Sequence, residues 1–365
     1  MLNSVGSQKL PSLDGWRAIS ILLVLVSHST ITAGFPLKPE TALFYWCAAL
    51  GNWGVRFFFV ISGFLITHLM LQEHAKTGHI SLKRFYLRRA LRILPVCSIY
   101  LTVLCACTHY SQPASLWLAN FTFTTNFVKI DQPSPTDHLW SLGVEEQFYV
   151  LWPCLLFFIL HRPKGASKLA KILILPLLIA PMVRVLYHRT LYPDVLQFLF
   201  LDSSFFSQFD SLAYGCLAAF SFNFLRNPLE KFCGKRVLPA LLAVLFIFAP
   251  MFIPFIHNLP RRLEVAGFDS MQAIGFSLLI LQSILRSDFC FYRSLNWKWV
   301  REIGVLSYSI YIWQQMFCTG YMVFGVKNAW WVAFPAWILL TLVMASASYY
   351  FLEKPLLNLR AKLRG

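Results

Sequence analysis

The sequence predicts an all-α membrane protein, a single domain over residues 1–365 built as a bundle of about ten transmembrane helices. Three observations support this class. Of the 365 residues, 57% are hydrophobic and only 13% are charged, too few charges for the surface of a soluble protein. Apolar blocks of about 20 residues, the length that crosses a bilayer, recur along the whole chain. The basic residues gather between these blocks, as in cytoplasmic loops.

Each predicted span is one of these apolar blocks. We expect the first block to be a retained span and not a signal peptide, because its arginine and histidine would serve nothing in a discarded segment. Segment 112–140, in which aromatic residues alternate with Thr and Asn, is expected to lie at the membrane interface or to re-enter the membrane. The run 353–355 (Glu-Lys-Pro) is expected to end the last span, because proline cannot continue a helix. In order, the spans are residues 14–33, 46–72, 93–111, 141–161, 171–187, 204–225, 237–256, 264–285, 304–324 and 331–352.

The distribution of Lys and Arg predicts the orientation. If the N-terminus is cytoplasmic and the spans alternate, 24 of the 32 Lys and Arg residues face the cytoplasm, while Arg56 and Arg184 are counted at the outer ends of their spans. The positive-inside rule requires this asymmetry, so both termini are expected in the cytoplasm. The net charge of +16 then reflects membrane orientation, and no nucleic-acid partner is expected. The nine cysteines show no metal-ligand spacing, so no metal is expected.

The first span, "RAISILLVLVSH", contains Arg17 and His28. Eleven residues make about three helical turns, so the two side chains share one face and lie about 16 Å apart. Arg17 can simply snorkel to the cytoplasmic interface. His28 lies near the middle of the membrane, where an ionisable side chain usually faces a cavity or a partner, although it can also bond to a helix neighbour. A neutral imidazole there can act as a general base.

Residues 56–67, "RFFFVISGFLIT", place Ser62 and Gly63 inside an apolar helix. Small residues allow helices to approach closely. They also let a narrow ligand chain pass beside the backbone.

Residues 83–95, "KRFYLRRALRILP", carry five cations. Arg84, Arg88 and Arg92 form an i, i+4 row, and Arg89 lies three residues before Arg92, so the cations crowd one helix face. They can set orientation, bind anionic lipid headgroups, or bind a phosphate-rich cytosolic ligand in bidentate fashion.

Residues 138–153, "HLWSLGVEEQFYVLWP", place Glu145 and Glu146 at the start of an apolar span. One carboxylate can stabilise a helix N-terminus. Two, with Gln147 and Tyr149, exceed that need. Glu145 enters from the outer face to a depth similar to that of His28, so we expect the two to meet in one cavity, where the carboxylate orients the imidazole.

These motifs, together with "YSIYIWQQ" (308–315) and the terminal "EKP", occur in an order that resembles the acyltransferase-3 family over essentially the whole chain. Members are mostly bacterial inner-membrane proteins. They transfer acetyl, or another short acyl group, from cytosolic acyl-CoA to hydroxyls of sugars such as the O-antigen of lipopolysaccharide, peptidoglycan, exopolysaccharide or Nod factor, and some modify macrolides.

The resemblance implies roles for individual residues. Arg17 and His28 match the family's essential Arg/Lys-x10-His pair, and Arg89 and Arg92 match its Arg-x-x-Arg motif beside the acyl-CoA entrance. Glu145 matches the glutamate of the "SL-x-V-E-E-Q" element. The predicted site thus comprises His28 and Glu145 as catalytic residues; Arg17, Arg88, Arg89, Arg92, Ser62 and Gly63 for the donor; and Glu146, Tyr149, Tyr311 and Gln314 for the acceptor.

The implied partners are acyl-CoA, by default acetyl-CoA, a glycan or glycolipid acceptor, and membrane lipids. Some relatives carry a fused periplasmic SGNH hydrolase-like domain. This chain ends about a dozen residues after its last predicted span, so we expect direct transfer or a separate periplasmic partner. A proton-coupled transporter or flippase of a glycan or lipid precursor is the rival class, because intramembrane His and Glu suit a carrier. No inverted repeat supports that class. A subunit active only with a partner is a third possibility.

Overall fold

The computed structural model describes residues 10–107, 112–128, 134–162, 165–188, 203–234, 237–257, 261–326 and 329–362. Within these ranges the chain is helical and contains no strand, which confirms the predicted all-α class. In chain order the elements are α1 Leu13–Ser29, α2 Ala42–Thr77, α3 Leu82–Cys107, α4 Ala114–Phe121, η1 Thr125–Phe127, α5 Leu139–Leu160, α6 Gly165–His188, α7 Phe205–Phe224, α8 Arg226–Cys233, α9 Leu238–His257, α10 Arg261–Leu285, α11 Cys290–Ser294, α12 Lys298–Cys318, α13 Gly320–Val323, η3 Trp330–Val332, α14 Ala336–Ser348, η4 Tyr349–Glu353 and α15 Lys354–Lys362.

Among the described residues, six helices are long and apolar enough to cross a membrane, or seven if the bent pair α8–α9 is one span. The six are Ala42–Thr77, Leu82–Ala106, Leu139–Leu160, Gly165–Leu186, Ala266–Leu285 and Ala336–Asn358. Each remaining predicted span falls on a helix, namely α1, α7, α9 or α12. The helices therefore agree with a polytopic membrane protein, and the number of ten membrane spans stays a prediction.

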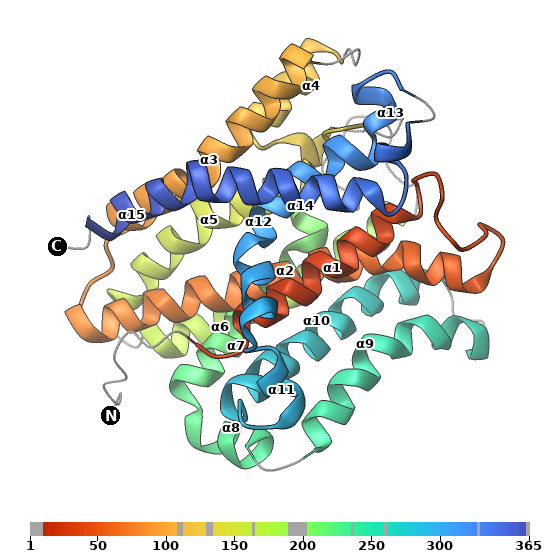
Figure 1. The fold of residues 1–365 in the computed structure, drawn as a ribbon. Helices are drawn as coiled ribbons and strands as arrows, with labels where there is room; N and C mark the ends of the chain where they lie inside the picture. The colour runs from red at the N-terminus through yellow and green to blue at the C-terminus, as the bar shows by residue number, and fades with distance from the viewer. Residues whose placement is uncertain are drawn as a thin grey trace. The chain divides into compact units, whose positions relative to one another are not determined.

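The chain divides into two compact units. Unit 1 comprises residues 1–17, 56–80 and 144–301. In it α10 packs against α9, α6 and α7, and α8 lies beside α7 and α9 (Figure 1).

The part of α2 that belongs to unit 1 packs on α7 backbone to backbone. A Cβ on Gly63 would lie 2.0 Å from the carbonyl oxygen of Leu212, and one on Gly215 would lie 2.1 Å from that of Val60. No larger residue fits either position without moving a helix. The predicted close approach at Ser62-Gly63 is therefore confirmed.

Unit 2 comprises residues 18–55, 81–143 and 302–365. In it α15 and η4 pack against α3 (Figure 1). The rest of α1 approaches α2 at two glycines: a Cβ on Gly51 would lie 2.6 Å from Ser27 Oγ, and one on Gly54 would lie 2.4 Å from the carbonyl oxygen of Ser20.

The expected end of the last span at Pro355 is wrong, because the helix continues through a π turn from α14 into α15. In that turn the N–H of Lys354 bonds to the carbonyl of Tyr349, five residues back, and the wider turn accommodates the proline. Glu353 is also not an interfacial charge. It is buried and accepts a hydrogen bond from Ser309 of α12.

The described part of segment 112–140 forms α4, η1 and a turn at residues 134–138. Most of its polar side chains pack inward: Asn120, Thr125, Asn126, Ser134 and Thr136 are buried, whereas Thr122 and Thr124 are exposed. The Thr- and Asn-rich composition thus reflects a packed part of unit 2.

Candidate functional site

His28 lies near the end of α1 and is held by a side chain from α12. Its Nδ1 lies 3.0 Å from Oε1 of Gln314, and both residues belong to unit 2. An amide oxygen only accepts, so Nδ1 carries the hydrogen and the lone pair is on Nε2. Nε2 has no hydrogen-bond partner in the part of the chain that the structure describes. A neutral imidazole in this tautomer can remove a proton from a hydroxyl.

Gln314 is fully buried, and within the described ranges its Nε2 has no hydrogen-bond partner. The sequence marked Gln314 for the acceptor route, and the structure makes it the partner of His28. The predicted partner, Glu145, belongs to unit 1, and its pairing with His28 stays a prediction.

His138, the first residue of the 138–153 motif, was missed by sequence reasoning. Its Nε2 lies 3.2 Å from the carbonyl oxygen of Ile312 on α12. Tyr311 donates to the His138 carbonyl at 2.8 Å, and its hydroxyl lies 2.5 Å from Ser141 Oγ. We call His28, His138, Tyr311 and Gln314 the histidine cluster; all four belong to unit 2. The available signal was a second histidine at the start of a membrane helix.

Three predicted residues of unit 1 are brought together between α2 and α5. Ser62 Oγ donates to Glu145 Oε1 at 2.6 Å, and the Tyr149 hydroxyl donates to Ser62 Oγ at 3.1 Å. The short distance to Glu145 is typical of a bond to an ionised carboxylate. Glu146 follows directly on α5 and is half-buried.

The predicted donor-binding arginines lie on two helices. Arg88, Arg89 and Arg92 are half-buried on the first half of α3, where the Arg89 guanidinium lies 5.9 Å from the centre of the Phe85 ring. Arg17 lies on α1, which continues unbroken to His28, so the predicted single helix through both residues is confirmed.

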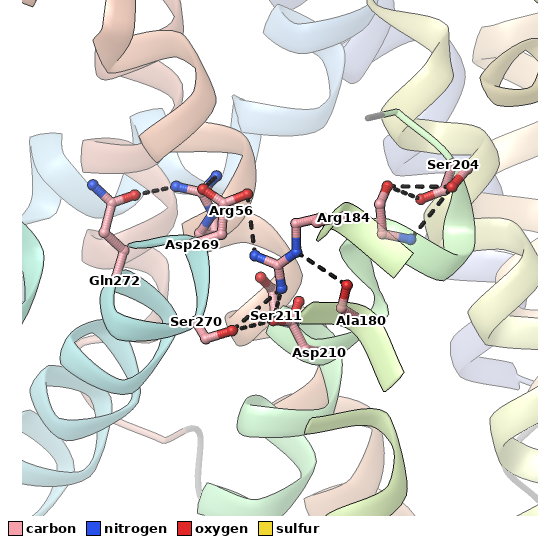
Figure 2. Close-up of polar contacts among 10 residues, drawn as sticks. Arg56, Ala180, Arg184, Ser204, Asp210, Ser211, Asp269, Ser270 and Gln272 are labelled. Atoms are coloured by element: carbon pink, nitrogen blue, oxygen red, sulfur yellow. Dashed lines mark hydrogen bonds and ion pairs between the residues drawn. The ribbon is translucent and has the colours of Figure 1, made fainter. Parts of the chain in front are cut away.

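A second buried cluster, which we call the charge network, joins four helices of unit 1 (Figure 2). Asp269 of α10 pairs with Arg56 of α2 at 2.5 Å and with Arg184 of α6 at 3.4 Å. Arg184 also pairs with Asp210 of α7, which accepts a bond from Ser270 at 2.6 Å. The network is thus Arg56, Arg184, Asp210, Asp269, Ser270 and Gln272, the last of which accepts from Arg56.

Sequence analysis counted Arg56 and Arg184 as charges at the outer ends of spans, but they are 7% and 2% exposed inside unit 1. Each lies within an apolar stretch, and aspartates lie in two other helices. Two arginines and two aspartates inside apolar segments could have indicated buried ion pairs from the sequence alone. Among the described residues, no three His, Cys, Asp or Glu side chains are grouped so that they could hold a metal ion.

The fold and the histidine cluster define a class: a helical membrane protein with two neighbouring histidines held by one of its helices. The sequence profile of the acyltransferase-3 family, described as an acyltransferase domain, matches residues 10–353. The chain therefore belongs to the acyltransferase-3 family.

Curated relatives support the match. The chain is 28% identical to the peptidoglycan O-acetyltransferase OatA of Listeria monocytogenes, over 95% of this chain and 56% of the relative. It is 29% identical to the O-acetyltransferase OatA of Staphylococcus aureus (95% and 57%) and 27% identical to the putative peptidoglycan O-acetyltransferase YrhL of Bacillus subtilis (95% and 55%). The chain thus spans little more than half the length of these relatives. No solved structure matches it.

Proposed function

We propose that the chain is an integral membrane O-acyltransferase that moves an acyl group, acetyl in the first instance, from acyl-CoA to a hydroxyl of a carbohydrate. The observation that carries this proposal is the hydrogen bond between His28 and Gln314, because it leaves the lone pair of Nε2 available as a base. The family and the names of the relatives supply the reaction type and the glycan class of the acceptor.

In the proposed step, His28 Nε2 takes the proton of the acceptor hydroxyl while the hydroxyl oxygen attacks the thioester carbonyl carbon. The carbon–sulfur bond breaks, and the imidazolium returns its proton to the departing CoA thiolate. Gln314 holds the required tautomer, so the roles of Glu145 as a second catalytic residue and of Tyr149 and Glu146 in acceptor binding stay predictions from the sequence. An acyl-histidine intermediate on His28 is the covalent variant of the same step.

Arginines of α3 are proposed to bind the phosphates of CoA. Guanidinium groups suit bidentate phosphate recognition, and half-buried arginines retain an accessible face. The proposed topology has ten spans with both termini in the cytoplasm, which places Arg17 and this end of α3 on the side where acyl-CoA occurs. Lysine and arginine asymmetry supports that orientation. The proposed location is the bacterial inner membrane, and a separate extracytoplasmic protein is a possible partner.

The test is an assay of the purified protein in detergent with acetyl-CoA and peptidoglycan strands from which O-acetyl groups have been removed. Release of free CoA thiol and label on the glycan are measured together. We expect His28→Ala to lower the rate by at least about a hundredfold. The matched control is His79→Ala, which changes an exposed histidine between α2 and α3 and should leave the rate unchanged. A transporter consumes no thioester, so a wild-type protein that releases no CoA, or an active His28→Ala, would contradict the proposal.

A further inference from the structure

His138 is the most conspicuous polar side chain that the proposed reaction leaves unused. It lies in the turn at residues 134–138, directly before α5, and is only 4% exposed. A carbonyl oxygen only accepts, so the bond to Ile312 requires the hydrogen on Nε2. The lone pair is therefore on Nδ1, the opposite tautomer from that of His28.

Nδ1 of His138 is buried and has no hydrogen-bond partner in the described part of the chain. A buried acceptor without a donor carries a desolvation penalty, so such a group requires an explanation, of which a bound ligand is one.

The ring is held by contacts on several sides. Its centroid lies 5.5 Å from the Tyr100 ring and 5.4 Å from the Tyr311 ring. Tyr311 also holds the His138 backbone carbonyl, and Nε2 is held by Ile312. The surrounding packing therefore preserves the unfilled lone pair.

His138 and His28 are neighbours within unit 2. One turn of α12 supplies the partners of both, Ile312 and Gln314, and the two imidazoles interact electrostatically. Burial, and to a smaller extent the nearby His28, lower the pKa of His138 to about 3, so His138 is neutral at pH 7. A neutral imidazole in this tautomer accepts at Nδ1 and does not donate there.

Three nitrogen atoms of the histidine cluster lack a hydrogen-bond partner among the described residues, and together they indicate which groups a ligand should carry. His28 Nε2 and His138 Nδ1 each need a donor, whereas the buried Nε2 of Gln314 needs an acceptor. A molecule with two hydroxyl groups satisfies both imidazoles. The acyl carbonyl, or the oxyanion that forms from it, satisfies the amide.

We propose that His138 Nδ1 accepts a hydrogen bond from a second hydroxyl of a polyhydroxylated acceptor and so positions the first hydroxyl at His28. The inference rests on the proposed function, because it assigns a further residue to the same reaction. It also narrows the acceptor class to molecules that present a second hydroxyl close to the acylated one, on the same sugar or on an adjacent one. His138 is then a hydroxyl-binding residue and takes no proton in the reaction.

Two near-isosteric substitutions separate this role from a structural one. In His138→Gln the amide nitrogen can keep the bond to the Ile312 carbonyl, but the acceptor at Nδ1 is lost. In His138→Asn the amide oxygen can replace Nδ1 as an acceptor, but the bond to Ile312 is lost. If His138 only anchors the turn, the Asn variant is the damaged one. If it binds the acceptor, the Gln variant is.

In the assay above, with peptidoglycan strands and acetyl-CoA, we expect His138→Gln to raise the KM for the strands by about three- to tenfold, the effect of one neutral hydrogen bond. Its KM for acetyl-CoA and its unfolding temperature should stay at wild-type values, and His138→Asn should retain the lower KM for the strands. A normal strand KM in His138→Gln would overturn the inference. If wild type is active and His28→Ala is not, that result leaves the proposed function standing.

A second measurement follows the bound acceptor in the wild-type protein and uses a variant only to assign a resonance. In wild-type protein labelled with [15N]histidine, the Nδ1 resonance of His138 should move when peptidoglycan strands are added, because a lone pair that accepts a hydrogen bond changes its shift. The spectrum of His138→Asn, which lacks that resonance, assigns it. A resonance that stays in place at strand concentrations that saturate turnover would also overturn the inference.

Discussion

The charge network of unit 1 and the histidine cluster of unit 2 both place polar side chains among apolar helices, but the first pairs opposite charges and the second does not. In the charge network each arginine has an aspartate and each aspartate an arginine, although Arg56 Nε and Arg184 Nη1 have no hydrogen bond in the described part of the chain. In the histidine cluster the members are neutral, and both His138 and Gln314 keep a buried atom without a partner. Closed pairing is what a scaffold requires, because an unpaired charge inside a membrane protein is costly. Unfilled neutral positions indicate a place for a ligand.

The largest expected effect concerns the charge network. Asp210→Ala leaves Arg184, which is 2% exposed, without its main partner, and should destabilise the protein by about 3–5 kcal/mol. The measurement is thermal unfolding in detergent.

The matched control for that variant is Glu230→Ala, which breaks the half-exposed pair with Arg226 and should cost about 0–1 kcal/mol. The double variant Arg184→Met/Asp210→Leu should recover most of the loss, because an apolar pair can replace a buried ion pair. A fully stable Asp210→Asn protein that has lost transfer would place the charge network in the reaction instead and end the comparison.

The second effect concerns Gly63. Gly63→Ala drives a methyl group against the Leu212 carbonyl and should destabilise by about 1–3 kcal/mol. Gly267→Ala is the matched control, since nothing lies within 4 Å of the added Cβ on α10, and it should be neutral or stabilising. A stable Gly63→Ala protein with a raised KM for acetyl-CoA would instead support the predicted contact with the donor chain.

The third effect concerns the histidine cluster. Gln314→Met keeps the length of the side chain but removes the acceptor for His28 Nδ1, so turnover should fall by about tenfold, the effect of one hydrogen bond. The control is its neighbour: Gln315→Met removes the bond to the Ser134 carbonyl and should leave turnover nearly unchanged. In wild type, 15N shifts should show hydrogen on Nδ1 of His28 and on Nε2 of His138. The same tautomer in both rings would contradict the site geometry.

Sequence reasoning recovered the fold class because apolar block length and charge distribution act locally and need no knowledge of contacts. It also singled out five polar residues inside apolar blocks, which the structure joins by hydrogen bonds in two groups: His28 with Gln314, and Ser62 with Glu145 and Tyr149. Sequence reasoning could not predict which side chains form hydrogen bonds with one another. The tautomer of His28 depends on which residue of α12 lies opposite, and helix packing decides that.

Two features were misassigned for related reasons. Arg184 looks like a charge near the end of a span, and only the three-dimensional position of Asp210 shows that it is buried. Pro355 looks like a helix end, but the π turn before it changes the backbone pairing. In both cases a local rule was overridden by a contact or a backbone register that no single stretch of sequence contains.

The smallest expected effect concerns one carboxyl of unit 2, that of Asp137. Asp137 lies in the turn before α5, accepts a bond from the Ser134 N–H at 2.6 Å, and has one oxygen, Oδ1, without a hydrogen bond in the described chain. Burial raises its pKa from 3.8 to about 6, although the Ser134 bond opposes that change. Because the folded state holds the proton more tightly than the unfolded chain, this carboxyl favours folding below about pH 4, and its contribution is lost as the pH rises through about 6.

The unfolding temperature of wild type relative to Asp137→Asn should therefore decrease between pH 5 and pH 7, because the asparagine keeps the acceptor for Ser134 but does not ionise. The measurement is thermal unfolding of both proteins across this range in one detergent. Parallel curves for wild type and Asp137→Asn would mean that Asp137 is ionised and satisfied when folded, and that an unfilled oxygen in unit 2 does not by itself mark an open position.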